Sequence, residues 1–156
     1  MKKTLLLATA FVFAMAGIAQ QTSDSVNKQT ADAVIKVATE KHDFGKIKQG
    51  IPVDYYFEIK NISDKPIVVE NSWASCGCTT PEKITEPIMP GATTKLKVQF
   101  NAAAVAVFAK DVYVKLAGVD QPKTLHISGE VLSVEAYDTY VKEKGDNKGK
   151  TKDNNN

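Results

Sequence analysis

A period-two alternation of apolar and polar residues runs through the middle of the chain and limits its possible folds most. Over residues 53–60, Val53, Tyr55, Phe57 and Ile59 alternate with mostly polar neighbours. The same kind of pattern recurs over further stretches: 34–39, 67–73, 96–100, 108–116 and 125–131. Because successive side chains of a strand point to opposite faces, each stretch is predicted to be a half-buried β-strand.

A convincing helical stripe is absent from this part of the sequence. The alanine-rich residues 102–109 lie between two strand patterns, and so short a segment does not hold a helix unaided, so we expect a loop entering a strand. Turn residues are predicted to separate the strands, among them Gly45, Gly50 and the pair Pro90–Gly91. The sequence therefore predicts an all-β chain, an immunoglobulin-like antiparallel β-sandwich of about seven strands.

The N-terminus has the pattern of a secretory signal peptide. Two lysines precede an apolar run over residues 5–16, and small residues stand at the −3 and −1 positions of a cut predicted after Ala19. The run is shorter than the roughly 20 residues that span a bilayer, so we expect no membrane span after cleavage. The mature protein is predicted to be periplasmic or secreted.

Polar segments flank the predicted domain. Residues 20–33 are rich in Gln, Thr, Ser and Asp, and the chain after residue 143 has no apolar residue. Such segments cannot bury enough apolar surface to fold alone, so disorder is predicted at both ends. The predicted organisation is a signal peptide (1–19), a disordered lead (20–33), a sandwich domain (34–134) and a disordered polar tail (135–156).

The charge pattern argues against nucleic-acid binding. Of the 20 basic residues, two lie in the predicted signal peptide, which leaves eighteen lysines against eighteen acidic residues in the mature chain. The sequence has no arginine, the residue whose forked guanidinium suits phosphate recognition. We therefore expect no nucleic-acid partner.

Both cysteines of the protein lie in a turn around Gly77, which we call the Cys-Gly-Cys turn (residues 75–79). The first interpretation is a local turn, oxidised or not, that shapes a surface for binding something else. In an exported protein, Cys76 and Cys78 are most often disulfide-bonded, and Gly77 is predicted to help close so small a ring. A redox role is a second interpretation, although the usual motif has two residues between the cysteines, at a helix start. The third is a copper site, or a zinc site with His42 as an added ligand. All three interpretations remain open.

Counting outward from the predicted turn at residues 61–65 sets Cys76 opposite Gly50 at one end of the sandwich. An immunoglobulin-like order brings other segments to that end. The Cys-Gly-Cys turn is thus predicted to share one pole with His42, Asp43, Asn101 and the residues after Val131.

Several motifs along the chain resemble those of the family of domains of unknown function numbered 1573. The motifs are, in order, His42–Ile47 with Gly50, Phe57-x-x-x-Asn61, Pro66-Ile67-x-Val69, Cys76–Thr79, Pro87-Ile88-x-Pro90-Gly91 and Phe100-Asn101. The resemblance covers about residues 37–131. It implies a secreted bacterial protein with an immunoglobulin-like fold related to Hydin-type and pilus-chaperone-like domains. The family has no settled activity, so the resemblance implies fold and compartment only.

No set of general acid, base and nucleophile can be assembled from the sequence. His126 lies between two inward residues and is expected to face solvent, and Trp73 is expected in the core. We therefore predict a protein that is not an enzyme and needs no cofactor. It is expected to bind or scaffold a protein partner, since edge strands of an open sandwich accept a partner's strand. The alternative is a small periplasmic thiol redox or copper-binding protein that uses Cys76 and Cys78.

Overall fold

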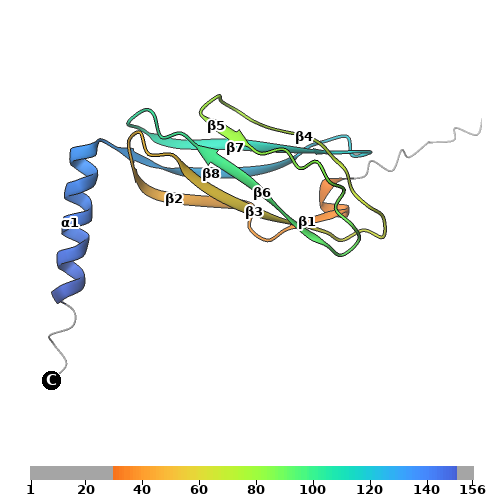
Figure 1. Ribbon diagram of the computed structural model, residues 1–156, viewed down its shortest axis with the longest axis horizontal. Helices are drawn as coiled ribbons and strands as arrows, with labels where there is room; N and C mark the ends of the chain where they lie inside the picture. Colours follow the sequence, from red (N-terminus) through yellow and green to blue (C-terminus); the bar gives the residue numbers. More distant parts are fainter. Residues whose placement is uncertain (1–29, 151–156) are drawn as a thin grey trace, which may run out of the picture.

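The computed structural model describes residues 30–150 as two packed sheets, with a helix projecting from one end (Figure 1). The first sheet has the order β1-β3-β6-β5. Its strands are β1 (Ile35–Val37), β3 (Val53–Asn61), β6 (Thr93–Phe100) and β5 (Thr79–Pro81). The second sheet has the order β2-β8-β7-β4. Its strands are β2 (Lys41–Lys48), β8 (Lys123–Leu132), β7 (Val107–Leu116) and β4 (Val69–Ala74).

This strand order is that of an immunoglobulin-like sandwich, so the predicted fold class is confirmed. The first sheet corresponds to the ABED sheet of such domains, and β4, β7 and β8 correspond to CFG. Adjacent strands pair antiparallel throughout the two sheets, except that β2 pairs parallel to β8. The sandwich is thus mixed at one edge rather than wholly antiparallel.

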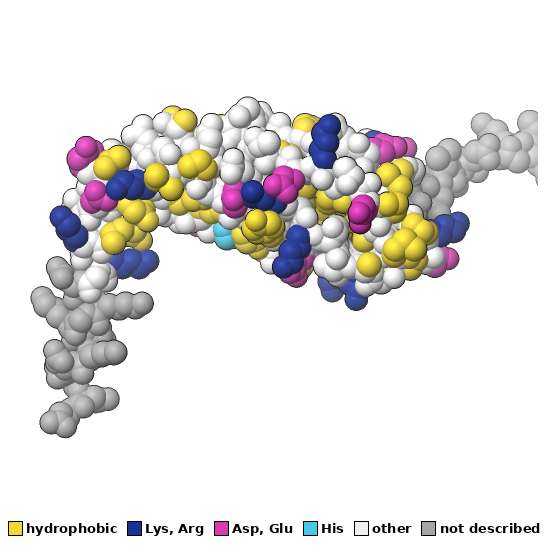
Figure 2. Space-filling model, viewed as in Figure 1, with side chains coloured by type: hydrophobic (Ala, Val, Ile, Leu, Met, Phe, Trp, Pro, Cys, Tyr) yellow, Lys and Arg dark blue, Asp and Glu magenta, His cyan; other side chains and the backbone are white. Residues whose placement is uncertain are grey.

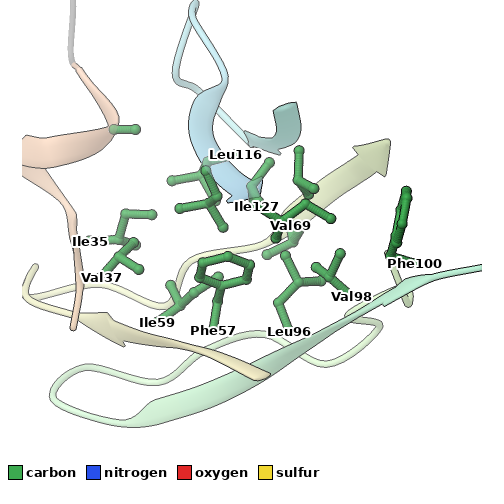
Figure 3. Packing of buried hydrophobic residues seen from close by; sticks show 14 of the residues in the cluster. Ile35, Val37, Phe57, Ile59, Val69, Leu96, Val98, Phe100, Leu116 and Ile127 are labelled. Carbon is green, nitrogen blue, oxygen red and sulfur yellow. The ribbon is translucent and has the colours of Figure 1, made fainter. Parts of the chain in front are cut away.

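The core between the sheets is built from the inward positions of the alternating stretches. Figure 3 shows Phe57, Leu96 and Val98 of the first sheet pointing toward Leu116 and Ile127 of the second. All five side chains are almost fully buried. Burial of each such side chain stabilises the fold by about 1.5–3 kcal/mol relative to exposure. The alternating pattern therefore favours two sheets that cover each other's apolar faces.

Strand β2 corrects the expectation that Gly45 lies in a turn between strands. The segment is one strand of eight residues with a bulge between Asp43 and Lys46. At the bulge, Gly45 has φ +65° and donates its N–H to the Asp43 carboxylate at 2.9 Å. The chain turns at Gly50 instead, where φ is +75°. The polar composition of this edge strand hid it from periodicity analysis.

Helix α1 (Val134–Lys150) differs from the predicted disordered tail that begins at residue 135. Ser133 caps the helix, because its Oγ accepts the Ala136 N–H at 3.2 Å. Asp138 forms an ion pair with Lys48 at 2.7 Å, and Lys46 lies 4.9 Å from the centre of the Tyr140 ring. These contacts tie the start of the helix to β2. The last six residues of the predicted tail lie outside the described residues.

The N-terminal boundary of the domain also lies earlier than predicted. Residues Ala31–Ala33 form the 3-10 helix η1, and the Ala31 side chain is buried in the core. The Nζ atom of Lys123 in β8 contacts Asp32 at 2.5 Å and Glu40 at 2.6 Å, which fastens this segment to the second sheet. The signal peptide and most of the predicted lead, residues 1–29, lie outside the described residues.

Candidate functional site

The Cys-Gly-Cys turn carries the chain from the edge of one sheet to the edge of the other. Strand β4 ends at Ala74 in the second sheet, and β5 begins at Thr79 in the first. Within the turn, Cys76 and Cys78 form a disulfide with a Cα–Cα distance of 5.3 Å, inside the usual range for such bonds. The Thr79 N–H donates to the Cys76 carbonyl at 3.3 Å and closes the turn.

Gly77 does not adopt the glycine-specific backbone conformation that was expected to help close the ring. It is absent from the described glycines with positive φ, whereas Gly91, beside Pro90 in the turn before β6, has φ +75°. A Cβ at Gly77 would meet nothing within 4 Å. The small ring therefore closes with a backbone that other residues can adopt, and Gly77 is simply exposed at the tip.

Both arms of the turn are fixed by hydrogen bonds to neighbouring strands. The Ser75 N–H donates to the Asp111 carbonyl at 2.9 Å, and the Asp111 N–H donates to Ser75 Oγ at 3.1 Å. On the other arm, the Asn101 N–H donates to the Cys78 carbonyl at 3.0 Å. The disulfide is thus held between β7 and the end of β6, and Asn101 lies beside it as predicted.

The two sulfur atoms share one hydroxyl. Thr79 Oγ1 lies 3.6 Å from Cys76 Sγ and 3.9 Å from Cys78 Sγ. Thr79 is only 4% exposed, and Cys78 packs against the apolar core. The sequence did not predict a role for the Thr79 side chain, because a threonine after Cys78 has the pattern of an ordinary strand residue.

A row of four side chains crosses the outer face of the second sheet beside the turn, and we call it the outer-face cluster: Trp73, Tyr113, Asp111 and His126. The Trp73 and Tyr113 rings stack with centroids 5.3 Å apart. The Tyr113 hydroxyl donates to Asp111 Oδ2 at 3.4 Å, and Asp111 Oδ1 lies 2.7 Å from His126 Nδ1. Aromatic and charged groups on three strands are thus interlocked at the surface.

The cluster corrects one expectation from the sequence. Trp73 was expected in the core, but it is 38% exposed, because it pairs with outward-facing Tyr113 of β7. A β-bulge between Val69 and Asn71 shifts the inward and outward positions of β4 and turns the tryptophan out. His126 faces outward, as its position between Leu125 and Ile127 indicates. Asp111 and Tyr113 occupy alternate positions of β7, so the alternation in the sequence could have placed both side chains on the outer face.

His42 lies away from the disulfide, so the set of Cys76, Cys78 and His42 is not assembled. His42 is in β2 and the turn follows β4, and these strands form opposite edges of the second sheet (Figure 1). The His42 ring stacks on Tyr55 with centroids 3.6 Å apart and meets Phe44 edge-on. Burial lowers the pKa of His42 from its ordinary value, and the Asp43 carboxylate offsets part of that shift. Along the strands, His42 lies nearly level with the turn, because it pairs with Ile127, which pairs with Lys110 next to Asp111. It is separated from the disulfide by the width of the sheet, whereas Asn101 lies beside the disulfide.

Metal ligands do not gather elsewhere in the part of the chain that the structure describes. Among the residues whose side chains the structure describes, no group of three or more His, Cys, Asp or Glu is arranged to hold a metal ion. The same residues include no helix long and apolar enough to cross a membrane.

The family model of a protein of unknown function, DUF1573, matches residues 35–131, which is nearly the whole sandwich. The chain belongs to this family. A comparison with curated proteins found no match. Membership in DUF1573 agrees with the motif order along the sequence, and the match ends at Val131, one residue before the end of β8.

Solved structures similar to this DUF1573 member confirm the fold. A protein of unknown function from Porphyromonas gingivalis W83 has a TM-score of 0.53 at 17% identity, over 62% of this chain and 46% of that one. The secreted serine protease VesC from Vibrio cholerae has a TM-score of 0.53 at 12% identity, over 70% of this chain and 25% of that one. This chain therefore spans less than half of either protein.

A PapD-like domain of human CEP192 is similar over nearly its whole length. The TM-score is 0.52 at 10% identity, over 84% of this chain and 99% of that domain. At such low identity, the likeness concerns the fold alone. It supports an immunoglobulin-like, PapD-like sandwich for this family member.

Proposed function

We propose that this protein is an exported binding or scaffolding module whose outer face holds a partner without catalysis. The observation that carries the proposal is the outer-face cluster beside the disulfide. Exposed Trp73 and Tyr113, with Asp111 between Tyr113 and His126, have the composition of a protein-binding surface, where aromatic residues dominate the binding energy. The partner that suits such a surface is another protein.

The order of the cluster favours binding in a second way. The rings of Trp73 and Tyr113 stack on each other, and the Asp111 carboxylate contacts both the Tyr113 hydroxyl and the His126 ring. Side chains that are already fixed lose less entropy when a partner binds, so more of the contact energy appears as affinity. The backbone bonds between Asp111 and Ser75 connect this surface to the disulfide turn.

The edge strands offer a weaker surface than the outer face. Strand β2 carries three lysines and a bulge, and both features oppose the addition of a partner's strand. Strand β4 has Ser72 Oγ bonded to the Glu82 carbonyl at 2.9 Å, so the segment after β5 lies along it. Strands β1 and β5 have only three residues each. We therefore assign the partner to the outer face of the second sheet.

Site-specific photo-cross-linking in the native cells tests this assignment. A photoreactive side chain at Thr124, which pairs with Tyr113 on the outer face, is expected to give an adduct of defined mass. The matched control is Lys95, an exposed residue of the first sheet. Trp73→Ala in the same chain should abolish the Thr124 adduct. Equal adducts from Thr124 and Lys95, or a Thr124 adduct that survives Trp73→Ala, would contradict the assignment.

Export is part of the proposal and is supported by the N-terminal residue pattern. We propose cleavage after Ala19 and a periplasmic or secreted mature protein that begins at Gln20. The mass of the protein purified from the cell envelope or medium measures this directly. A full-length mass in the cytoplasmic fraction would overturn the proposal.

A further inference from the structure

The Thr79 hydroxyl is placed where it does little for the oxidised protein. It lies within 3.6 Å and 3.9 Å of the two sulfur atoms of the disulfide. A disulfide sulfur has no proton to donate and accepts hydrogen bonds weakly. At 4% exposure, the residue is also shielded from water. The same hydroxyl would have a strong acceptor if one of the sulfurs became a thiolate, since bonds to charged groups are about twice as strong.

We propose that Cys76 and Cys78 form a thiol–disulfide exchange site for a dithiol or its disulfide, with Thr79 as the positioning residue that stabilises the thiolate. The proposal does not depend on the protein-binding proposal, because it concerns the chemistry of the isolated chain. It adds a reaction to a turn that otherwise only shapes a surface.

The surroundings of the two sulfurs assign different roles to them. Cys76 stands between the exposed residues Ser75 and Gly77, whereas Cys78 precedes buried Thr79 and packs against the core. Both cysteines are half-buried, but only Cys78 packs against the core. The Cys76 sulfur is therefore the one that meets an external thiol or disulfide, and Thr79 Oγ1 is also nearer to it. Cys76 is therefore the attacking residue and Cys78 the resolving one.

The exchange balances in atoms and electrons. In the reduced protein, the Cys76 thiolate attacks one sulfur of the partner's disulfide, and the other sulfur of that bond leaves as a thiolate. Cys78 then loses its proton and attacks Cys76 Sγ in the mixed disulfide, which expels the partner's second thiolate. The partner gains two electrons and two protons, and the protein gains its disulfide. In the reverse direction, a dithiol opens the Cys76–Cys78 bond by attack on Cys76.

The alkylation rate of the reduced full chain, measured from pH 5 to pH 10, tests the role of Thr79. Iodoacetamide is the probe, and mass spectrometry of the peptide reports each cysteine. We expect Cys76 to react faster than Cys78, with its midpoint below the ordinary thiol pKa of about 8.5. Thr79→Val should raise that midpoint by about one pH unit, which is about tenfold slower alkylation at pH 7. Thr79→Ser should restore the wild-type profile, and Thr80→Val, one residue further, is the control.

Any of three results would overturn the proposal. The first is a Thr79→Val profile that coincides with that of the wild type, and the second is a Cys78 that reacts before Cys76. The third is a disulfide that dithiothreitol reduces only after unfolding in urea, because Cys76 would then be inaccessible in the native state. Should Thr79→Val fail to fold, as shown by circular dichroism, Thr79→Ala and Thr79→Ser allow the same comparison.

Discussion

His42 is a polar residue whose ring packs against aromatic side chains at the edge of the sandwich. Its ring lies flat on Tyr55 of the opposite sheet at 3.6 Å, and Phe44 meets it edge-on at 4.5 Å. Stacked rings contribute about 0.5–1.5 kcal/mol beyond the area that they bury. Burial disfavours the charged imidazolium and therefore lowers the pKa of His42.

The lowered pKa makes a prediction about acid stability. A group whose pKa is lower in the folded state stabilises the fold above its unfolded value, about 6.5 for histidine, and this stability is lost as the pH falls through the folded value. His42→Phe keeps the ring but removes the titration. Between pH 8 and pH 5, the urea midpoint of the wild type should therefore fall more than that of His42→Phe.

The second histidine of the protein provides the control. His126 lies on the outer face of the sheet, with a side chain 44% exposed. Wild type, His42→Phe and His126→Phe are compared by urea unfolding, followed by tryptophan fluorescence, at pH 8, 6.5 and 5. Parallel pH dependence of the wild type and His42→Phe would contradict the role given to the His42 ring.

At the residue scale, sequence patterns predict where polar residues lie better than they predict which groups those residues form hydrogen bonds with. Composition correctly indicates a turn near Asn61, but the Asn61 side chain is fully buried and donates to the carbonyls of Lys65 and Ile88, both at 2.7 Å. The second contact joins residues that are 27 positions apart. No local pattern encodes such a contact, and the same holds for the hydrogen bond between Asp111 and Ser75, which are 36 positions apart.

At the element scale, the clamp around Lys123 joins η1 and the chain before β2 to strand β8. Burial alone would lower the pKa of Lys123, but hydrogen bonds to Asp32 and Glu40 outweigh burial and raise it. A raised pKa stabilises the fold below the unfolded value, and this stability is lost as the pH rises through the folded value, above about 10.5. The clamp should therefore open in alkali.

Lys123→Gln tests the clamp. At pH 8, the loss of two charge-assisted hydrogen bonds is expected to cost about 1–2 kcal/mol, since both carboxylates are partly exposed. The difference from the wild type should shrink at pH 11. Lys95→Gln removes an exposed ion pair with Glu58 and should cost less than about 0.5 kcal/mol. Equal effects of the two substitutions at pH 8, measured by urea unfolding, would argue against the clamp.

Strands whose two faces differ strongly are predictable from sequence, and edge elements are not. The alternation in β3, β6, β7 and β8 is strong because one face of each is buried in the core. Strand β2 lies at an edge, carries five polar or charged residues, and has a bulge that interrupts its parity. Helix α1 has few apolar residues, and its start is fixed by a cap and by contacts with β2 rather than by periodicity.

At the scale of the whole molecule, the disulfide turn belongs to the surface and not to the framework. Figure 2 shows a face on which lysine and acidic side chains are interspersed with small hydrophobic patches, in keeping with the nearly balanced charge of the chain. The framework is the core between the two sheets, with its fully buried side chains from both. The Cys76–Cys78 bond does not link the two sheets through the core, and only Gly77 lies between the two bonded cysteines. The bond is therefore expected to add little to the stability of the fold.

Equilibrium urea unfolding of the oxidised wild type and of the double variant Cys76→Ser/Cys78→Ser tests this claim most directly. A ring of three residues removes little entropy from the unfolded chain, so the chain-entropy relation gives a stabilisation of only about 1.6 kcal/mol. We expect the double variant to fold, with the same dependence on urea and a free energy of unfolding lower by no more than about 2 kcal/mol. A loss of 4 kcal/mol or more (roughly the value of a bond closing a loop of many tens of residues), or a chain that does not fold, would show that the turn holds the fold together.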